Sequence, residues 1–183
     1  MEMVFGKLPV LETGRLRLRR LTLDDADDIF RYGQDPEVTR YLAWEKHRSI
    51  LDSRQFIEAS IEQYDNLEPS PWGIALKESD RIIGTGGFIS WLPEHGRGEI
   101  GYALARNYWG QGFMTEAVAE IVRFGFEILN LNRIQAMCEP ANTGSERVME
   151  KSGMSYEGIL RRYMVQHGEF CDMKIYSILR KEW

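Results

Sequence analysis

Cysteine and histidine are scarce in this chain, which has two of the first and three of the second among 183 residues. Cys138 and Cys171 are too few to build a disulfide framework, and they lie far from any histidine pair that would suit a structural zinc site. We therefore expect no metal ion and a protein that keeps its thiols reduced, as cytoplasmic proteins do.

Long apolar runs are absent as well. No stretch reaches the roughly 20 apolar residues that cross a bilayer, and residues 1–7 lack the basic and then apolar pattern of a secretion signal. A composition of 43% hydrophobic and 28% charged residues is typical of a soluble protein with a sizeable core. We expect one domain over residues 1–183 and no membrane partner.

Positive charge is also in short supply, because 28 acidic residues against 23 lysines and arginines leave a net charge of −5. Domains that bind nucleic acids usually carry a basic face, so we expect no nucleic-acid partner. The densest basic cluster is four arginines between positions 15 and 20, which alternate with Leu16 and Leu18. This period of two predicts a strand with one solvated face rather than a nucleic-acid patch.

Periodicity and turn signals predict a mixed succession of strands and helices. Strands are expected at 15–21, 72–77, 82–89, 98–104, 133–139, 155–165 and 170–179. Helices are expected at 22–32, 35–41, 50–66, 117–129 and 145–152, with Thr22 as the cap of the first and Gly153 in a left-handed conformation after the last. This order predicts an α/β (α+β) fold in which helices cover both faces of a mixed, mainly antiparallel sheet.

A glycine-containing turn stands between the strand at 98–104 and the helix at 117–129. It reads Trp109-Gly110-Gln111-Gly112-Phe113-Met114-Thr115. Such a turn presents backbone N–H groups at the positive end of a helix dipole, where a phosphate or pyrophosphate binds. Gly-x-Gly alone is more often an ordinary tight turn, and Thr115 stands where dinucleotide binders have a third glycine.

Further motifs extend this signal over nearly the whole chain. They are Leu11-Glu12-Thr13-x-Arg15-Leu16-x-Leu18-Arg19, Gly98-Glu99-Ile100-Gly101-Tyr102, Leu131-Asn132-Arg133-Ile134, Asn142-x-x-Ser145, Met149-Glu150-Lys151-x-Gly153-Met154, Glu157-Gly158 and Gly168-x-x-x-Asp172. With the turn among them, the chain resembles the GNAT superfamily of acyl-coenzyme A-dependent N-acetyltransferases, specifically the RimJ/RimL type, which acetylates the N-termini of ribosomal proteins. The resemblance implies a GNAT fold and transfer of an acetyl group from acetyl-coenzyme A, a co-substrate, to a primary amine.

The resemblance also implies where the coenzyme binds. The family's pyrophosphate loop follows the pattern Arg/Gln-x-x-Gly-x-Gly/Ala, and Trp109 and Met114 depart from it while Gly112 matches. Backbone donors do not depend on side-chain type, so binding is still expected. The strand before the loop would pair with the pantetheine arm and splay from the next strand, which residues alone do not reveal. The expected coenzyme-binding residues are Tyr102, Ala103, Leu104, Trp109, Gly110, Gln111, Gly112, Phe113, Met114, Thr115, Asn142 and Ser145.

Acetyl transfer also needs a donor for the leaving thiolate. Many family members use a tyrosine seven residues after the asparagine, but that position holds Met149 here. Ser145 resembles the RimL-type donor, and a serine there is equally typical of a helix N-cap. A backbone N–H near Tyr102 would stabilise the oxyanion.

The attacking amine must lose a proton, and Glu99 is the leading base candidate because the strand that carries it lies beside the thioester. A salt-bridged carboxylate on a strand face is an equally typical role for it. Glu139 is the second candidate. A third alternative needs no side-chain base, since an α-amino group has an unperturbed pKa near 8.

The sequence does not identify the acceptor amine. It is either a protein N-terminus or a small molecule such as an aminoglycoside or a polyamine. A coenzyme A-binding regulatory module without turnover is the alternative that Met149 favours. A homodimer is one alternative for the oligomeric state. Trp44, Trp91, Tyr102 and Tyr163 are candidates for an acceptor cleft, although aromatic residues at such places more often belong to the core. Asp172 is expected to bind a cationic acceptor or to pair with Arg161 or Arg162, and His47, His95 and His167 are expected to be surface or turn residues.

Overall fold

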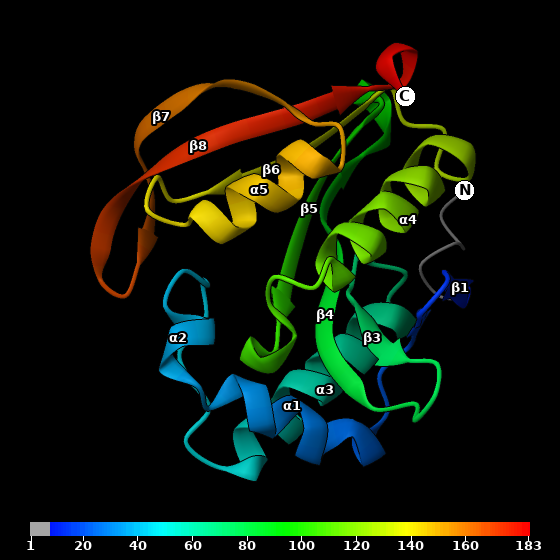
Figure 1. The fold of residues 1–183 in the computed structure, drawn as a ribbon, viewed down its shortest axis with the longest axis vertical. Helices are drawn as coiled ribbons and strands as arrows, with labels where there is room; N and C mark the ends of the chain where they lie inside the picture. The colour runs from blue at the N-terminus through cyan, green and yellow to red at the C-terminus, as the bar shows by residue number, and fades with distance from the viewer. Residues whose placement is uncertain (1–7) are drawn as a thin grey trace.

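The computed structural model describes residues 8–183 and builds them around an eight-stranded sheet in the order β1-β2-β3-β4-β5-β6-β8-β7 (Figure 1). Residues 1–7, where we expected no secretion signal, lie outside the described residues. Neighbouring strands are antiparallel except β5 and β6, which run parallel. The predicted mixed, mainly antiparallel α/β sheet is thus confirmed.

The elements follow the predicted order with one addition, the short strand β1. The strands are β1 (Leu11–Glu12), β2 (Leu16–Arg19), β3 (Trp72–Leu76), β4 (Ile82–Leu92), β5 (Arg97–Leu104), β6 (Arg133–Cys138), β7 (Ser155–Gln166) and β8 (Glu169–Leu179). The helices are α1 (Ala26–Gly33), α2 (Pro36–Thr39), α3 (Ile50–Asp65), α4 (Phe113–Glu127) and α5 (Thr143–Lys151). Within residues 8–183, three 3-10 turns connect elements and a fourth follows β8.

Helix α1 begins at Ala26 and not directly after Thr22, because residues 23–25 form a 3-10 turn. Two further helix starts differ from the prediction. Helix α4 begins at Phe113, four residues before the predicted start, because Gly112 takes a left-handed conformation (φ 80°) and buried Met114 already packs against the core. Helix α5 begins at Thr143, because Asn142 rather than Ser145 is its N-cap. Both differences fall at the candidate site.

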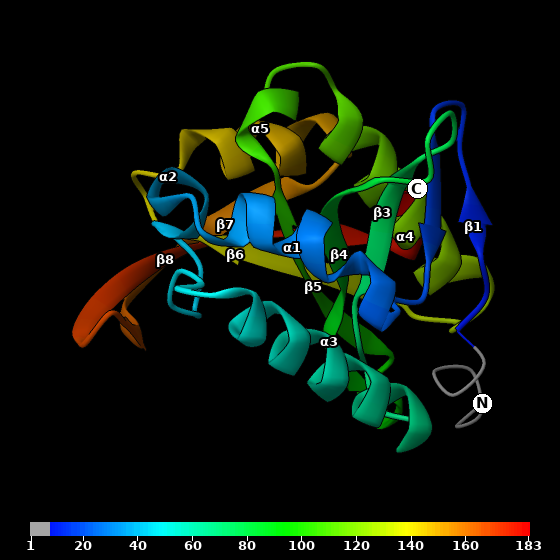
Figure 2. The same cartoon turned by 90° about the horizontal axis from the view of Figure 1, so that it is seen from below.

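Helices cover both faces of the sheet (Figures 1 and 2). Helices α4 and α5 pack on one face, where the larger core cluster includes Ile100, Ile121 and Ile134. Helices α1 and α3 pack on the other, where Ile29, Ile57 and other side chains form a smaller cluster. Because side chains alternate along a strand, each strand at the site presents different residues to the two faces.

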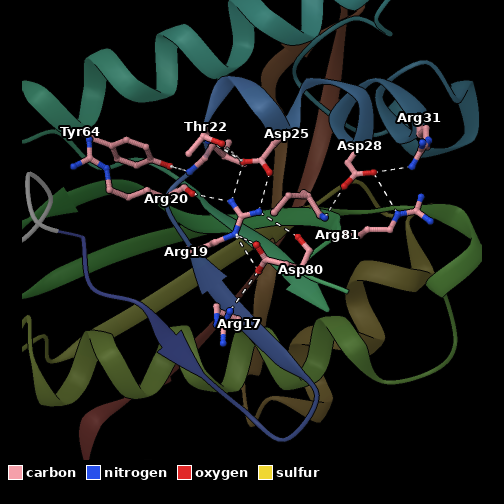
Figure 3. Close-up of polar contacts among 12 residues, drawn as sticks. Arg17, Arg19, Arg20, Thr22, Asp25, Asp28, Arg31, Tyr64, Asp80 and Arg81 are labelled. Carbon is pink, nitrogen blue, oxygen red and sulfur yellow. Dashed lines mark hydrogen bonds and ion pairs between the residues drawn. The ribbon is translucent and has the colours of Figure 1, made fainter. Parts of the chain in front are cut away.

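The arginine-rich strand β2 has the predicted pattern, with Leu16 and Leu18 fully buried. Its arginines are engaged in the fold (Figure 3). Arg19 donates to both carboxylate oxygens of Asp25 at 2.8 and 2.9 Å and contacts Asp80, while Arg20 lies over the ring of Tyr64. These contacts tie β2 to the turn that opens α1 and to the β3–β4 turn.

Candidate active site

Strands β5 and β6 pair only at their beginnings. The parallel register joins residues 97–99 to residues 133–135, and it ends at Glu99 and Gln135. Beyond that point β5 continues along β4 as far as Leu104, and β6 continues along β8 as far as Cys138. Figure 1 shows the two strands diverging toward α2. The strands therefore splay, and a cavity lies on each face of the sheet near the opening.

The first cavity, here called the loop cavity, has a volume of about 610 Å³. It lies between the end of β5, the starts of α4 and α5, and the segment around α2. All the expected coenzyme-binding residues line it except Gln111, whose amide instead donates to the Asn107 carbonyl at 2.8 Å. Its lining also includes three basic residues that sequence reasoning did not select: Arg40, Arg147 and Lys151.

The glycine turn adopts a geometry that side chains would strain. Gly110 and Gly112 have φ angles of 72° and 80°, a region that glycine enters without penalty. The Glu116 N–H makes the first turn's bond to the Gly112 carbonyl at 3.0 Å. The N–H groups of residues 113–115 thus precede the first helical bond, as at any helix start. The start of α4 can therefore hold an anionic group at the wall of the loop cavity.

Arg15, which precedes β2, contacts the glycine turn and the first residues of α4. Its Nε donates to Glu116 at 2.7 Å, its Nη1 donates to the Gln111 carbonyl at 3.1 Å, and its guanidinium lies 4.0 Å from the centroid of the Phe113 ring. The Trp109 indole donates to the Leu104 carbonyl at 2.8 Å. Arg15 was predicted to be one of the strand's solvated arginines, but it precedes β2. No local pattern could have revealed a contact that spans about a hundred residues.

Ser145 and Tyr102 form a hydroxyl pair on the wall of the loop cavity. Ser145 Oγ lies 2.9 Å from the Tyr102 hydroxyl, which also lies 3.2 Å from the Ser145 carbonyl. Burial raises the pKa of Tyr102, so its phenol stays protonated at neutral pH. Asn142 Oδ1 accepts from the Ser145 N–H at 3.1 Å. The alternative that Ser145 is the N-cap is therefore wrong, because Asn142 fills that role.

Met149, at the position of the family's usual tyrosine, is fully buried in the core cluster. Met149 belongs to α5 and its side chain lies in the core. A thioether has no proton to donate. Among the predicted candidates, Ser145, Tyr102 and Thr115 are the residues with hydroxyl groups that line the loop cavity.

The second cavity, here called the Glu99 cavity, has a volume of about 460 Å³ and is lined from β4, β5, β6, β7 and β8. Its lining residues are Ser90, Leu92, Arg97, Gly98, Glu99, Arg133, Gln135, Glu157, Tyr163 and Ile175. Arg97 and Glu99 alternate along β5 with Ile100 and Tyr102, so this cavity lies on the face opposite α4 and α5. A bulge in β4 between Phe88 and Ser90 falls opposite Glu99.

A chain of hydrogen bonds orients Glu99 in this cavity. Gln135 Nε2 donates to Glu99 Oε2 at 2.8 Å, and Arg133 Nε donates to Gln135 Oε1 at 3.2 Å. Arg133 also forms a two-pronged ion pair with Glu157 at 2.7 and 2.6 Å, and the Ser177 hydroxyl donates to Glu157 at 2.6 Å. Hydrogen bonds from Arg133 and then Ser177 lower the pKa of Glu157 to about 2.

This arrangement refines the two interpretations of Glu99. Its partner is the neutral amide of Gln135, and no salt bridge to Glu99 exists within residues 8–183. Glu139, the second base candidate, lines neither cavity. Sequence reasoning missed Gln135 because the contact joins two strands 36 residues apart.

The remaining candidates have other surroundings. Tyr163 lines the Glu99 cavity, whereas Trp44 stacks near His47 and Phe56. Trp91 packs against the core. Asp172 accepts from the Arg162 backbone N–H at 2.8 Å, so the expected ion pair with an arginine side chain is replaced by a backbone contact.

The histidines line neither cavity. His47 is buried against Ser53 at 2.8 Å, not on the surface as we expected, because it packs under the α1–α3 layer. His167 lies in the two-residue β7–β8 turn and pairs with Glu45 at 3.1 Å. Within residues 8–183, no three histidine, cysteine, aspartate or glutamate side chains gather as metal ligands, and no helix is long and apolar enough to span a bilayer.

Comparison with known proteins agrees with this geometry. The model of the acetyltransferase (GNAT) domain matches residues 15–155. The chain is 39% identical to an uncharacterised N-acetyltransferase, p20, from Bacillus licheniformis, over 96% of this chain and 99% of that one. It is 38% identical to the uncharacterised N-acetyltransferase YoaA of Bacillus subtilis, over 94% of this chain and 97% of that one.

Solved structures share the fold. A GNAT-family acetyltransferase from Bacillus anthracis superposes with a TM-score of 0.84 at 28% identity, over 94% of this chain and 99% of that one. RimL, the ribosomal L7/L12 α-N-protein acetyltransferase in complex with coenzyme A, gives a TM-score of 0.82 at 17% identity, over 93% and 98% of the two chains. The chain therefore belongs to the GNAT acetyltransferase family and is an acyltransferase that uses acetyl-coenzyme A.

Proposed function

We propose that this acetyltransferase modifies the N-terminal amine of a protein, as RimJ/RimL-type enzymes do. The observation that carries the proposal is the pair of cavities at the splay of β5 and β6. One contains the loop and a hydroxyl pair, and the other contains an oriented carboxylate. Donor and acceptor approaching from opposite faces can meet at the gap between the strands.

The loop cavity is the proposed donor site. The pyrophosphate would accept hydrogen bonds from N–H groups at the start of α4, and the nearby cations Arg40, Arg147 and Lys151 would favour its negative charge. Among the described residues, the edge of β5 that faces the gap has no strand partner after Glu99, so its backbone can pair with the pantetheine arm. Donors in the segment around Tyr102 would face the thioester carbonyl and its oxyanion.

Two groups are proposed to move protons. Glu99 Oε2 is held by Gln135, while Oε1 has no partner within residues 8–183 and is available to the amine proton, directly or through water. When the amine nitrogen has bonded to the carbonyl carbon, the C–S bond breaks and the thiolate accepts a hydrogen bond from Ser145 Oγ. A Tyr102 phenol that donates to Ser145 Oγ leaves the serine proton free for sulfur.

A protein N-terminus suits the Glu99 cavity for two reasons. Its rim includes exposed side chains such as Tyr163 (54% exposed), so a polypeptide can continue away from the cavity. RimL, which shares the fold, is a ribosomal L7/L12 α-N-protein acetyltransferase.

A cytoplasmic location fits such a substrate. The homodimer also stays a prediction, and sedimentation analysis would check it.

Release of free coenzyme A thiol from acetyl-coenzyme A tests the proposal. Peptides with free N-terminal alanine or serine should accelerate release, and the same peptides with blocked N-termini should not. Aminoglycosides and polyamines form the comparison panel. Turnover with these small amines but with no peptide would contradict the N-terminal assignment. Turnover with none of them would contradict the proposed acceptor classes altogether.

A further inference from the structure

The Glu99 cavity contains four charged side chains, and two of them are fully engaged with each other. Arg133 uses Nε on Gln135, and it uses both terminal nitrogens on Glu157. Glu157 receives these two bonds and a third from Ser177. This pair is a structural clamp across β6, β7 and β8, so it has little capacity left for a ligand.

The other two charges are not compensated. Arg97 lines the cavity but has no ion pair or hydrogen bond to its guanidinium within residues 8–183, although acidic Glu99 and Glu157 line the same cavity. Glu99 has one carboxylate oxygen on Gln135 and one without a partner in the same part of the chain. The cavity therefore presents one cation and one anion to an incoming ligand.

The spacing of these two groups is set by the strand. Arg97 and Glu99 are two residues apart on β5, so their side chains leave the same face about 6.8 Å apart at the backbone. A ligand that satisfied both would carry an amine and, several ångströms away, an anionic group. The protein's net charge of −5 does not attract such an anion, so its recognition must be local.

Resting on the proposed function, we infer that Arg97 is a specificity-determining residue that selects acceptors with an anionic group close to the reacting amine. In a protein N-terminus this group is an acidic side chain at the second residue. In a free amino acid it is the α-carboxylate. The same chemistry serves both sources, because Arg97 recognises a carboxylate while the amine lies at Glu99.

Matched peptides test this inference. Peptide amides that begin Ser-Asp, Ser-Asn and Ser-Lys differ in charge at one position, and serine compared with serine amide tests the α-carboxylate. For the unmodified protein we expect the Ser-Asp peptide to show a KM about fivefold lower than Ser-Asn, a size typical of a solvent-exposed ion pair. The preference should shrink at 0.5 M salt.

Charge variants then identify the residue. Arg97→Gln should abolish the preference, and Arg97→Glu should reverse it toward Ser-Lys. Arg54→Gln removes an equal charge from an exposed position on α3 that lines neither cavity, and it should keep the preference. Thermal melts check that each variant is folded.

The outcomes separate the two proposals. Acetylation of all three peptides with equal KM, or a preference that survives Arg97→Gln, overturns the inference and leaves the proposed function intact. Acetylation of serine, but not of serine amide or any peptide, supports the role of Arg97 and contradicts the protein N-terminus. If no amine of the panel is acetylated, both the proposed acceptor classes and the role of Arg97 in selecting among them are contradicted.

Discussion

At the scale of single residues, the hydroxyl pair of Ser145 and Tyr102 is the feature most directly linked to chemistry. A serine hydroxyl alone is a poor acid. Either hydroxyl of the pair can be the donor, and we propose that the phenol donates to Ser145 Oγ and leaves the serine proton for the cavity. Burial of Tyr102 keeps the phenol protonated. We propose that the pair supplies the proton donor that buried Met149 cannot provide.

We expect Ser145→Ala to lower kcat about 100-fold, the lower end of the range for general-acid catalysis, because a thiolate is already a fair leaving group. Tyr102→Phe should lower it about tenfold, the worth of one hydrogen bond. Since Tyr102 acts through Ser145, the double variant should match Ser145→Ala. Steady-state kinetics with separate coenzyme A titrations measures both effects.

The control for this pair is Tyr108→Phe. Tyr108 lines the same cavity, and its hydroxyl has no hydrogen-bond partner within residues 8–183, so the loss of this hydroxyl should leave kcat unchanged. Strictly additive losses in the double variant would show that the two hydroxyls act separately. A Ser145→Ala variant within twofold of normal turnover would remove the serine from the chemistry.

Glu99→Gln tests the proposed base. Glutamine keeps the shape and can still accept from Gln135, but it cannot take the amine proton. We expect kcat to fall about 100-fold and the acidic limb of the pH–rate profile to flatten. Glu139→Gln is the matched control, since Glu139 lines neither cavity. If solvent deprotonates the amine instead, the position of the acidic limb will change with the pKa of each acceptor. The Glu99→Gln substitution will then leave the limb unchanged.

At the scale of elements, the clamp between Arg133 on β6 and Glu157 on β7 joins three strands of the sheet. The pKa of Glu157 is lowered to about 2, against roughly 4.3 for an unperturbed glutamate. Its contribution to stability is therefore present above about pH 4.3 and is lost as the pH falls toward 2.

We therefore expect Glu157→Gln to destabilise the protein at pH 7 and the difference from the unmodified protein to vanish near pH 2. Urea unfolding at pH 7, 4, 3 and 2 measures this difference. Glu58→Gln removes an exposed carboxylate on α3 that forms no ion pair within residues 8–183, and it controls for the loss of one charge. A difference for Glu157→Gln that stays constant from pH 7 to pH 2 would contradict the clamp.

At the scale of the whole molecule, the loop cavity, our proposed donor site, joins segments that lie far apart in the sequence. Acetyl-coenzyme A should therefore stabilise the entire fold. At 100 times its dissociation constant a ligand adds about 2.7 kcal/mol, which raises the Tm of a protein of this size by roughly 5–10 °C. A thermal melt with saturating acetyl-coenzyme A measures the rise.

Gly112→Val should abolish this rise, because a β-branched residue is strained at φ 80° and covers the approach to the start of α4. Gly168→Val places the same strain (φ 82°) in the β7–β8 turn, away from both cavities, so it should lower the Tm but keep the ligand's effect. An equal response to acetyl-coenzyme A in the two variants would show that Gly112 has no role in binding.

The sequence by itself determined what depends on neighbours along the chain. Alternating leucines and arginines predicted β2, apolar spacing predicted α3, and paired glycines predicted the turn before α4. The ordered motifs indicated the family and hence the loop before α4. These features depend on backbone preferences and local periodicity, which a single segment expresses without the rest of the molecule.

Only the tertiary structure decided which groups face one another across the sheet. The splay after Glu99 depends on how β4 and β8 draw β5 and β6 apart, and no residue in either strand encodes it alone. The contacts of Ser145 with Tyr102 and of Gln135 with Glu99 span 43 and 36 residues. Local sequence patterns do not predict contacts between residues so far apart in the chain. Packing of the whole sheet, rather than spacing along the chain, brings these side chains within hydrogen-bonding distance.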